Sequence, residues 1–122
     1  MGCTSCPEMD LGEWGEELHQ RLQGRRYPLG GTLEVTDRCN LSCVHCYINQ
    51  PSASRAAQTR ELSAAQIAGL LDQMAEAGTL FLLLTGGEPL LRLDFAEIYQ
   101  MARQRGMVVS LFTNGSLLTP RI

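Results

Sequence analysis

Three cysteines stand close together in this sequence, at the spacing Cys39-x3-Cys43-x2-Cys46, directly after a segment whose pattern predicts a strand. Thiolates at such short spacings are typical metal ligands. Structural zinc sites usually complete a shell of four protein ligands, whereas an iron-sulfur cube held by three cysteines keeps one iron open for a substrate or cofactor. The sequence therefore predicts a metal site, and an iron left open at such a site would imply chemistry.

Two further turns with unusual residues also follow predicted strands. The turn at residues 86–89 comes after the continuous apolar run 80–84, and the turn at residues 113–115 follows a later strand. In parallel α/β architectures, ligands bind outside the carboxyl ends of the strands. We therefore expect the cysteine loop and both turns to lie on one face of the molecule, with Asn114 as a candidate for lining a pocket there.

One helix and one strand are predicted before the cysteine loop. Residues 10–24 place Trp14, Leu18 and Leu22 at roughly helical spacing, and we expect this face to pack against the rest of the chain. Apolar and polar residues alternate at 32–36, which predicts a first strand. The cysteine loop begins directly after that strand.

A loop, a helix and a buried strand are predicted next. Residues 50–60 show no periodicity and are expected to form a connecting loop. Ser63 and Gln66 have the spacing of a capping box, and Gly78 is placed to end the helix that it starts. The apolar run at 80–84 is expected to be a parallel strand buried on both faces. The stripe of the helix that should face the sheet consists of Ile67, Leu70, Leu71 and Met74.

A second helix and strand repeat this unit. Asp94, with Glu97 three residues later, predicts a helix start, Gly106 predicts its end, and a strand is expected at 107–112. The alternation predicts an α/β fold whose parallel strands are joined by right-handed crossover helices. Three strands with an apolar edge make an incomplete sheet, so we expect a fragment of a longer protein. The inner face of this helix is expected to consist of Phe95, Ile98, Tyr99 and Ala102.

The cysteine loop at residues 39–47 and the segment 85–89 together closely resemble the radical S-adenosylmethionine (radical SAM) enzyme superfamily. Both motifs occur in the family's order and on the expected elements. The resemblance covers roughly residues 32–118 and implies the N-terminal half of a partial (β/α)6 TIM-like barrel. We accordingly expect a tail and helix at 1–30, and a core domain at 31–122 that is truncated at its C-terminal end.

The resemblance implies two cofactors and a reaction. Cys39, Cys43 and Cys46 would each bind one iron of a [4Fe-4S] cluster, and the fourth iron would chelate S-adenosylmethionine. One electron from the cluster would cleave the cofactor to a 5'-deoxyadenosyl radical, which abstracts hydrogen from a substrate. An electron donor such as flavodoxin or ferredoxin is an implied partner, and the style of the motifs looks most like members that modify peptides or proteins.

The same resemblance assigns roles to other residues. Gly86 and Gly87 would let the backbone approach the methionine moiety and bind its ammonium. Glu88 would add charge complementarity, and Pro89 would stiffen the turn. His45 stands beside the third cysteine, where many members have an aromatic residue near the adenine.

Composition excludes several classes of function. The 122 residues are 44% hydrophobic, which fits one globular domain, and the formal net charge of -3 provides no basic patch for nucleic acid. No apolar run approaches the roughly 20 residues that a membrane span requires. Five cysteines, three of them crowded together, suit metal ligation in a reducing compartment, so we expect a cytoplasmic protein.

Other interpretations of the same residues stay open. The loop cysteines could complete a zinc site with His45, although His45 adjoins Cys46 and neighbouring side chains seldom converge on one metal. Cys3 and Cys6 have the spacing of a metal pair, or else they are exposed thiols without a role. The chain could also be a truncated, non-catalytic cluster-binding module.

Overall fold

The computed structural model describes residues 10–48 and 50–119. Its main sheet has three parallel strands in the order β1-β4-β5, and two short strands, β2 and β3, pair in parallel beside it. Cys3 and Cys6 lie outside the described residues. The helices are α1 (Leu11–Leu22), α2 (Arg55–Arg60), α3 (Ala64–Ala77), the 3-10 helix η1 (Pro89–Leu91) and α4 (Phe95–Gln104). The strands are β1 (Gly30–Glu34), β2 (Arg38–Cys39), β3 (Gln50–Pro51), β4 (Phe81–Thr85) and β5 (Val108–Leu111).

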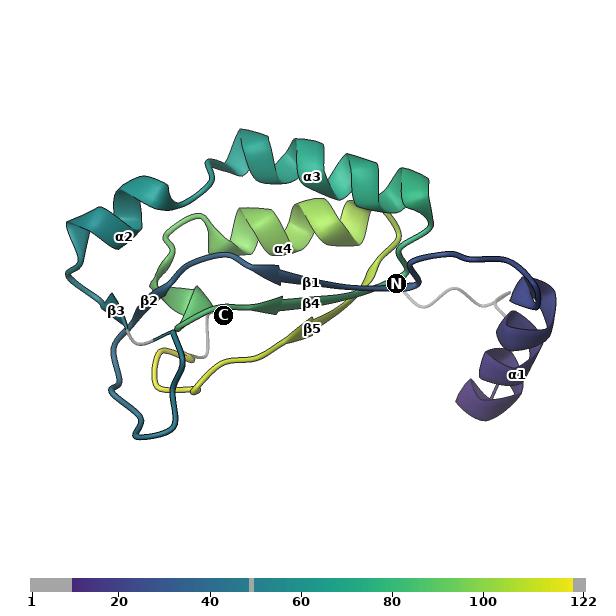
Figure 1. Cartoon of the computed structure of the whole chain (residues 1–122), viewed down its shortest axis with the longest axis horizontal. Helices are drawn as coiled ribbons and strands as arrows, with labels where there is room; N and C mark the ends of the chain where they lie inside the picture. The colour runs from purple at the N-terminus through teal and green to yellow at the C-terminus, as the bar shows by residue number, and fades with distance from the viewer. Residues whose placement is uncertain (1–9, 49, 120–122) are drawn as a thin grey trace.

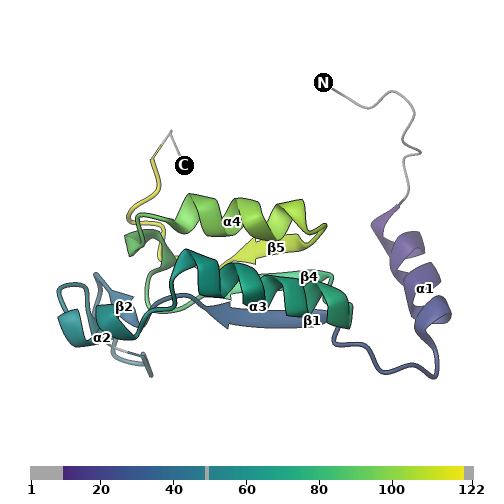
Figure 2. The ribbon, with the colours of Figure 1, turned by 90° about the horizontal axis from the view of Figure 1, so that it is seen from above.

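Helices α3 and α4 lie side by side on one face of the main sheet (Figures 1 and 2). The arrangement of parallel strands with crossover helices confirms an α/β fold and is compatible with part of a TIM-like barrel. None of the helices formed by residues 10–48 and 50–119 has the length and apolar character needed to cross a membrane.

The start and end of α3 confirm the sequence prediction. The Ser63 hydroxyl accepts a hydrogen bond from the Gln66 amide (3.3 Å), and the Gln66 side chain accepts one from the Ser63 amide (2.9 Å), so both halves of the capping box form. Gly78 ends the helix in the left-handed conformation with φ of 99°. These signals are local, and tertiary contacts did not override them.

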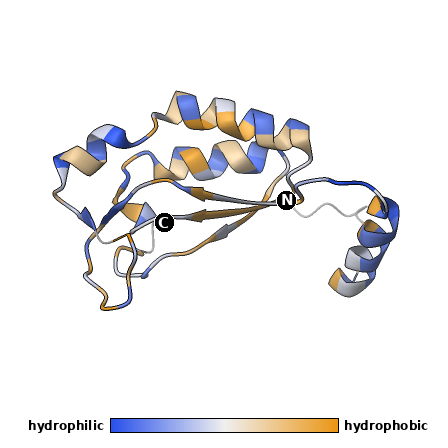
Figure 3. Cartoon of the chain, viewed as in Figure 1, coloured by the Kyte–Doolittle hydropathy of each residue, from blue (hydrophilic) through white to orange (hydrophobic). Residues whose placement is uncertain are grey.

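The core lies between the two helices and one face of the sheet. Leu82 and Leu84 point toward the helices and are almost fully buried, whereas Phe81 is 40% exposed on the opposite face. The prediction that this strand is buried on both faces is therefore wrong, because helices cover only one of them. Strand β4 is nevertheless hydrophobic along most of its length (Figure 3). The buried core consists of Leu33, Val35, Ile67, Leu71, Leu82, Leu84, Phe95, Ile98, Ala102 and Met107.

Helix α4 begins where the sequence predicts, but the predicted cap bond is absent. Asp94 occupies the N-cap position without a side-chain bond to the helix backbone. Its carboxylate instead pairs with the guanidinium of Arg92, at 2.6 Å between Oδ2 and Nη2. Tyr99, expected on the inner face, is 40% exposed.

The first helix packs less than expected. Asp10 caps α1 by accepting hydrogen bonds from the amides of the first turn, yet no residue of the helix is buried. Trp14 makes an edge-on contact with Phe81, with ring centroids 6.0 Å apart. The predicted packing role is therefore confirmed at Trp14 only in part, and the helix lies beyond the end of the sheet that is opposite the cysteine loop (Figure 1).

The prediction of a plain loop at residues 50–60 is wrong. The segment contains β3 and the short helix α2, which Ser54 caps by accepting a hydrogen bond from the amide of Ala57 (3.3 Å). Two turns of helix are too short to display hydrophobic periodicity, so only the buried Ala57 marks an inner face. Strand β1 also begins two residues earlier than the predicted start at position 32.

Candidate functional site

The three turns that the sequence singles out lie together at the carboxyl ends of the strands. In Figure 1 the strand arrows point toward the end where the cysteine loop and the loop after β5 lie. The amide of Glu88, after β4, donates to the carbonyl of Arg38 at 2.8 Å. The side-chain amide of Asn114, after β5, lies 3.9 Å from the sulfur of Cys39. The predicted meeting of these turns on one face is confirmed.

The cysteine loop projects from the sheet beyond β2. Cys39 and Cys46 are half-buried, Cys43 is exposed, and all three thiols are free of disulfides. The amide of Leu41 donates to the Cys39 sulfur (3.4 Å), and the amide of Cys46 donates to the carbonyl of Cys43 (3.1 Å), which closes a turn. The Cys43 thiol is thus accessible to solvent, and the thiols of Cys39 and Cys46 are partly accessible.

The side chains around the cysteine loop suit a cluster better than a single metal ion. Within residues 10–48 and 50–119, no three His, Cys, Asp or Glu side chains gather closely enough to hold a single metal ion. A [4Fe-4S] cube makes a different demand, because each cysteine binds a different iron and the three sulfurs do not converge on one point. Three free thiols on one accessible loop, with an amide donor at Cys39, fit the chemistry of a cluster.

The residues flanking Cys46 differ in their contacts. His45 is exposed to solvent. The Tyr47 hydroxyl donates a hydrogen bond to the carboxylate of Glu34 at 3.1 Å, which ties the end of the loop back to β1. This hydrogen bond to a carboxylate raises the pKa of Tyr47.

The two glycines after β4 allow a close approach between two segments of the chain itself. Gly86 has φ of 143°, and a Cβ there would collide with the carbonyl oxygen of Thr36. A Cβ on Gly87 would collide with the carbonyl of Arg38, and its amide donates to the Thr36 carbonyl at 2.8 Å. The glycines therefore hold the β4 turn against the residues that directly precede Cys39.

Glu88 points into the protein. Its side chain is fully buried and accepts hydrogen bonds from the Leu90 amide (2.9 Å), the Thr113 hydroxyl (2.8 Å) and the Asn114 amide (2.8 Å). The carboxylate is thus occupied by donors from its own turn and from the loop after β5. Pro89 is also buried and starts η1.

Asn114 links the loop after β5 to the cysteine loop. Besides its contact with Cys39, its Nδ2 donates to Oδ1 of Asn40 at 2.9 Å. The Asn114 Oδ1 accepts hydrogen bonds from the amide (2.9 Å) and hydroxyl (2.6 Å) of Ser116. Asn40 in turn donates to the Ser116 hydroxyl at 2.8 Å, so the side chains form a closed set of bonds across two loops.

Comparison with known protein families shows the family to which the chain belongs. The family model for the Radical SAM superfamily matches residues 33–122, a segment that includes all three turns of the site. This chain belongs to the radical SAM superfamily. The cysteine motif and the glycine turn that suggested the resemblance both fall within the matched region.

Several curated radical SAM relatives have different named activities. The AdoMet-dependent heme synthase of Methanosarcina barkeri is 40% identical over 73% of this chain and 25% of its own length. The mycofactocin maturase MftC of Mycolicibacterium smegmatis is 35% identical over 86% of this chain and 26% of its own length. The PqqA peptide cyclase of Xanthomonas oryzae pv. oryzae is 42% identical over 72% of this chain and 23% of its own length. All three names denote enzymes, and the chain spans about a quarter of the length of these relatives.

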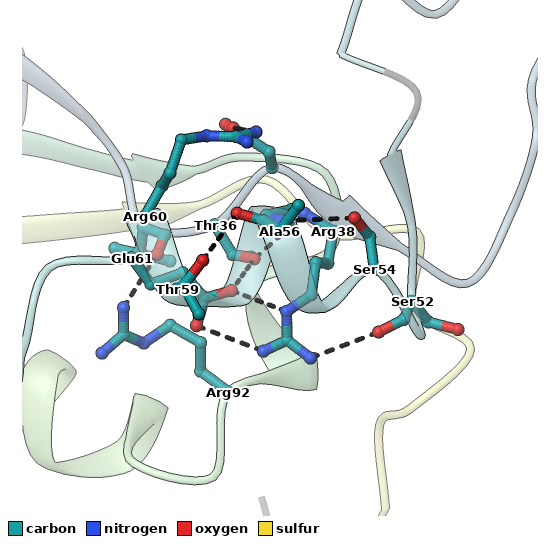
Figure 4. A network of polar contacts seen from close by, with 12 residues as sticks. Thr36, Arg38, Ser52, Ser54, Ala56, Thr59, Arg60, Glu61 and Arg92 are labelled. Carbon is teal, nitrogen blue, oxygen red and sulfur yellow. Dashed lines mark hydrogen bonds and ion pairs between the residues drawn. The ribbon is translucent and has the colours of Figure 1, made fainter.

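Arg38, the residue before Cys39, forms a buried ion pair with Glu61 in a network of polar contacts (Figure 4). Nε of Arg38 lies 2.7 Å from Oε1 of Glu61, and both side chains are nearly inaccessible, with 11% and 12% exposed. The Thr36 hydroxyl also donates to Glu61, and Arg38 donates to the carbonyl of Ser52. This network joins the residue before Cys39 to both ends of α2.

Arginine partners in this network lower the pKa values of two carboxyl groups, those of Glu61 and Asp94. Burial alone raises the pKa of Glu61, but hydrogen bonds from Arg38 and Thr36 outweigh it and lower that pKa overall. Arg92 donates to the carbonyl of Val35 at 2.9 Å and, through its hydrogen bonds, lowers the pKa of Asp94. These residues could not be predicted from the sequence, because nothing in their spacing indicates a pairing between positions 38 and 61.

Proposed function

We propose that this chain binds a [4Fe-4S] cluster through Cys39, Cys43 and Cys46, and S-adenosylmethionine beside it. The observation that carries this proposal is the meeting of the cysteine loop with the turns after β4 and β5, within a radical SAM match. The cofactor would be bound by the backbone at Gly86 and Gly87, with contributions from the residues around this turn and loop. These further residues are Pro89, His45 and Asn114, whereas the buried carboxylate of Glu88 would shape the turn without touching the cofactor.

The protein residues would position and tune the bound groups. When bound, the cluster and S-adenosylmethionine supply one-electron cleavage and hydrogen abstraction from a substrate. The side-chain amide of Asn114 would donate to the sulfur of Cys39, which disperses charge at that ligand. The exposed outer side of the loop, including Cys43, leaves room for an electron donor such as flavodoxin or ferredoxin to approach.

We further propose a peptide or protein as the substrate. The PqqA peptide cyclase, whose name denotes a peptide substrate, supports this class, and the mycofactocin maturase is a second relative named for a maturation step. The heme synthase among the relatives makes a small-molecule substrate the competing class.

The cluster assignment is tested by anaerobic reconstitution with iron and sulfide. We expect the wild-type chain to bind about four irons and to develop a broad visible absorption band. Cys39→Ala, Cys43→Ala and Cys46→Ala should each lose most of this absorption, because each removes one of three thiolate anchors. Ser42→Ala, in the same loop, is the matched control and should retain it.

Two results would contradict the assignment. One is a colourless wild-type protein that takes up stoichiometric zinc, which would support the zinc interpretation. The other is an iron content near wild type in all three cysteine variants.

A further inference from the structure

Glu88 carries a fully buried carboxylate that is held by hydrogen bonds rather than by an ion pair among the described residues. Burial of an ionised carboxylate is costly unless hydrogen bonds or an ion pair compensate for it. No basic side chain within residues 10–48 and 50–119 forms an ion pair with Glu88, so its partners are the Leu90 amide, the Thr113 hydroxyl and the Asn114 amide. The bond to Leu90 caps η1, and a short polar side chain could provide it. The hydrogen bonds from Thr113 and Asn114, which are 25 and 26 positions away, are not needed for this cap and join Glu88 to the loop after β5.

Glu88 forms hydrogen bonds both to the segment before the cysteine loop and to the loop after β5. Its amide donates to the carbonyl of Arg38, directly before Cys39, at 2.8 Å. Its carboxylate holds the backbone amide of Asn114, whose side chain reaches the Cys39 sulfur and Asn40. One residue therefore fixes the backbone on either side of the contact between Asn114 and Cys39.

We propose that Glu88 is a positioning residue: it clamps the loop after β5 so that the Asn114 amide donates to Cys39, and it does not itself contact the cofactor's ammonium. The inference rests on the proposed function, because Cys39 is there a cluster ligand. Hydrogen bonds to a ligating sulfur stabilise the reduced, more negative cluster and so raise its reduction potential. Through Asn114, Glu88 thus sets the ease with which the cluster is reduced.

The first measurement uses the metal-free chain. In Glu88→Gln the neutral amide accepts fewer and weaker hydrogen bonds, so the Asn114 amide should exchange with deuterium about tenfold faster, as expected for loss of a bond to a charged group. Glu97→Gln, an exposed glutamate on α4, is the matched control and should leave this exchange unchanged. Thr113→Val keeps the carboxylate but removes the hydroxyl that donates to both Glu88 oxygens and accepts from the Gly115 amide, and it serves where Glu88→Gln fails to fold. Unchanged Asn114 exchange in a folded Glu88→Gln or Thr113→Val variant would overturn the clamp.

The second measurement uses the reconstituted chain. Glu88→Gln should make the cluster's midpoint potential more negative, and the same change in an Asn114→Ala background should add no further shift, because Glu88 acts through Asn114. Equal shifts in both backgrounds, or a loss of S-adenosylmethionine binding at unchanged potential, would overturn the inference. If the wild-type chain forms no cluster, the proposed function fails, while the exchange measurement still decides whether Glu88 is a clamp.

Discussion

Gly86 and Gly87 pack against the backbone of Thr36 and Arg38, in addition to the cofactor role that is proposed for them. The sequence singled out both glycines for close approach to a cofactor. The structure shows a second reason for glycine at both positions: the carbonyls of Thr36 and Arg38 occupy the space that a side chain would need. Backbone contacts of this kind join segments some 50 positions apart, so no local pattern could reveal them.

This lack of space predicts that Gly87→Ala disturbs the cysteine loop as well as cofactor binding. The added methyl group must displace the carbonyl of Arg38, next to Cys39, and we expect a loss of about 2 kcal/mol in the free energy of unfolding. Denaturant unfolding of the metal-free chain measures it. Gly69→Ala is the matched control: this helical glycine has open space around its Cβ position, and the change should stabilise the chain by about 1 kcal/mol. An unchanged stability for Gly87→Ala would contradict the steric account.

At the scale of elements, α2 and the ion pair beneath it connect the cysteine loop to the rest of the fold. Arg38 reaches from β2 to Glu61, which follows α2, and to Ser52, which precedes it. The short helix is therefore part of the support for the residue before Cys39, rather than a plain connection. Its sequence gave little sign of this role, because six residues are too few for a periodic pattern.

The lowered pKa of Glu61 predicts a specific dependence of stability on pH. A carboxyl group whose pKa is lower in the folded than in the unfolded state stabilises the fold above its unfolded pKa, and that contribution is lost as the pH falls through the folded value. At pH 7, Glu61→Gln should cost about 3 kcal/mol, because it leaves the Arg38 charge buried without its partner.

The difference between wild type and Glu61→Gln should shrink as the pH falls below the ordinary glutamate range. Urea unfolding at a series of pH values measures it, with the exposed Glu76→Gln on α3 as the control. A difference that stays constant from neutral to acid pH would show that the Glu61 charge is not what stabilises the pair.

What the sequence could predict differs with the range of the interaction. The start of α3 at Ser63 and its end at Gly78 were predictable, because each depends on neighbouring residues. The Asp94 cap was not, because Arg92 competes for the same carboxylate. Among the site residues, the cysteines and glycines carry a sequence motif, whereas the inward orientation of Glu88 and the pairing of Arg38 with Glu61 depend on distant contacts.

In the whole molecule, the candidate site residues lie at the carboxyl ends of the strands, and the hydrophobic core lies on one face of the sheet. Helices α3 and α4 bury the inner face of β1, β4 and β5, which fixes the positions from which the three loops leave the strands (Figure 1). The loops then bond to one another through Glu88 and Asn114. The proposed function requires this cluster of loops to hold an iron-sulfur centre with an iron open to S-adenosylmethionine.

Electron paramagnetic resonance of the reconstituted, reduced chain tests this requirement most directly, with spectra recorded before and after addition of S-adenosylmethionine. The account predicts a reduced [4Fe-4S] signal whose g values shift when the cofactor is added, because the cofactor binds the iron that lacks a cysteine ligand. A cluster signal that is indifferent to the cofactor, or no cluster signal at all, would contradict it.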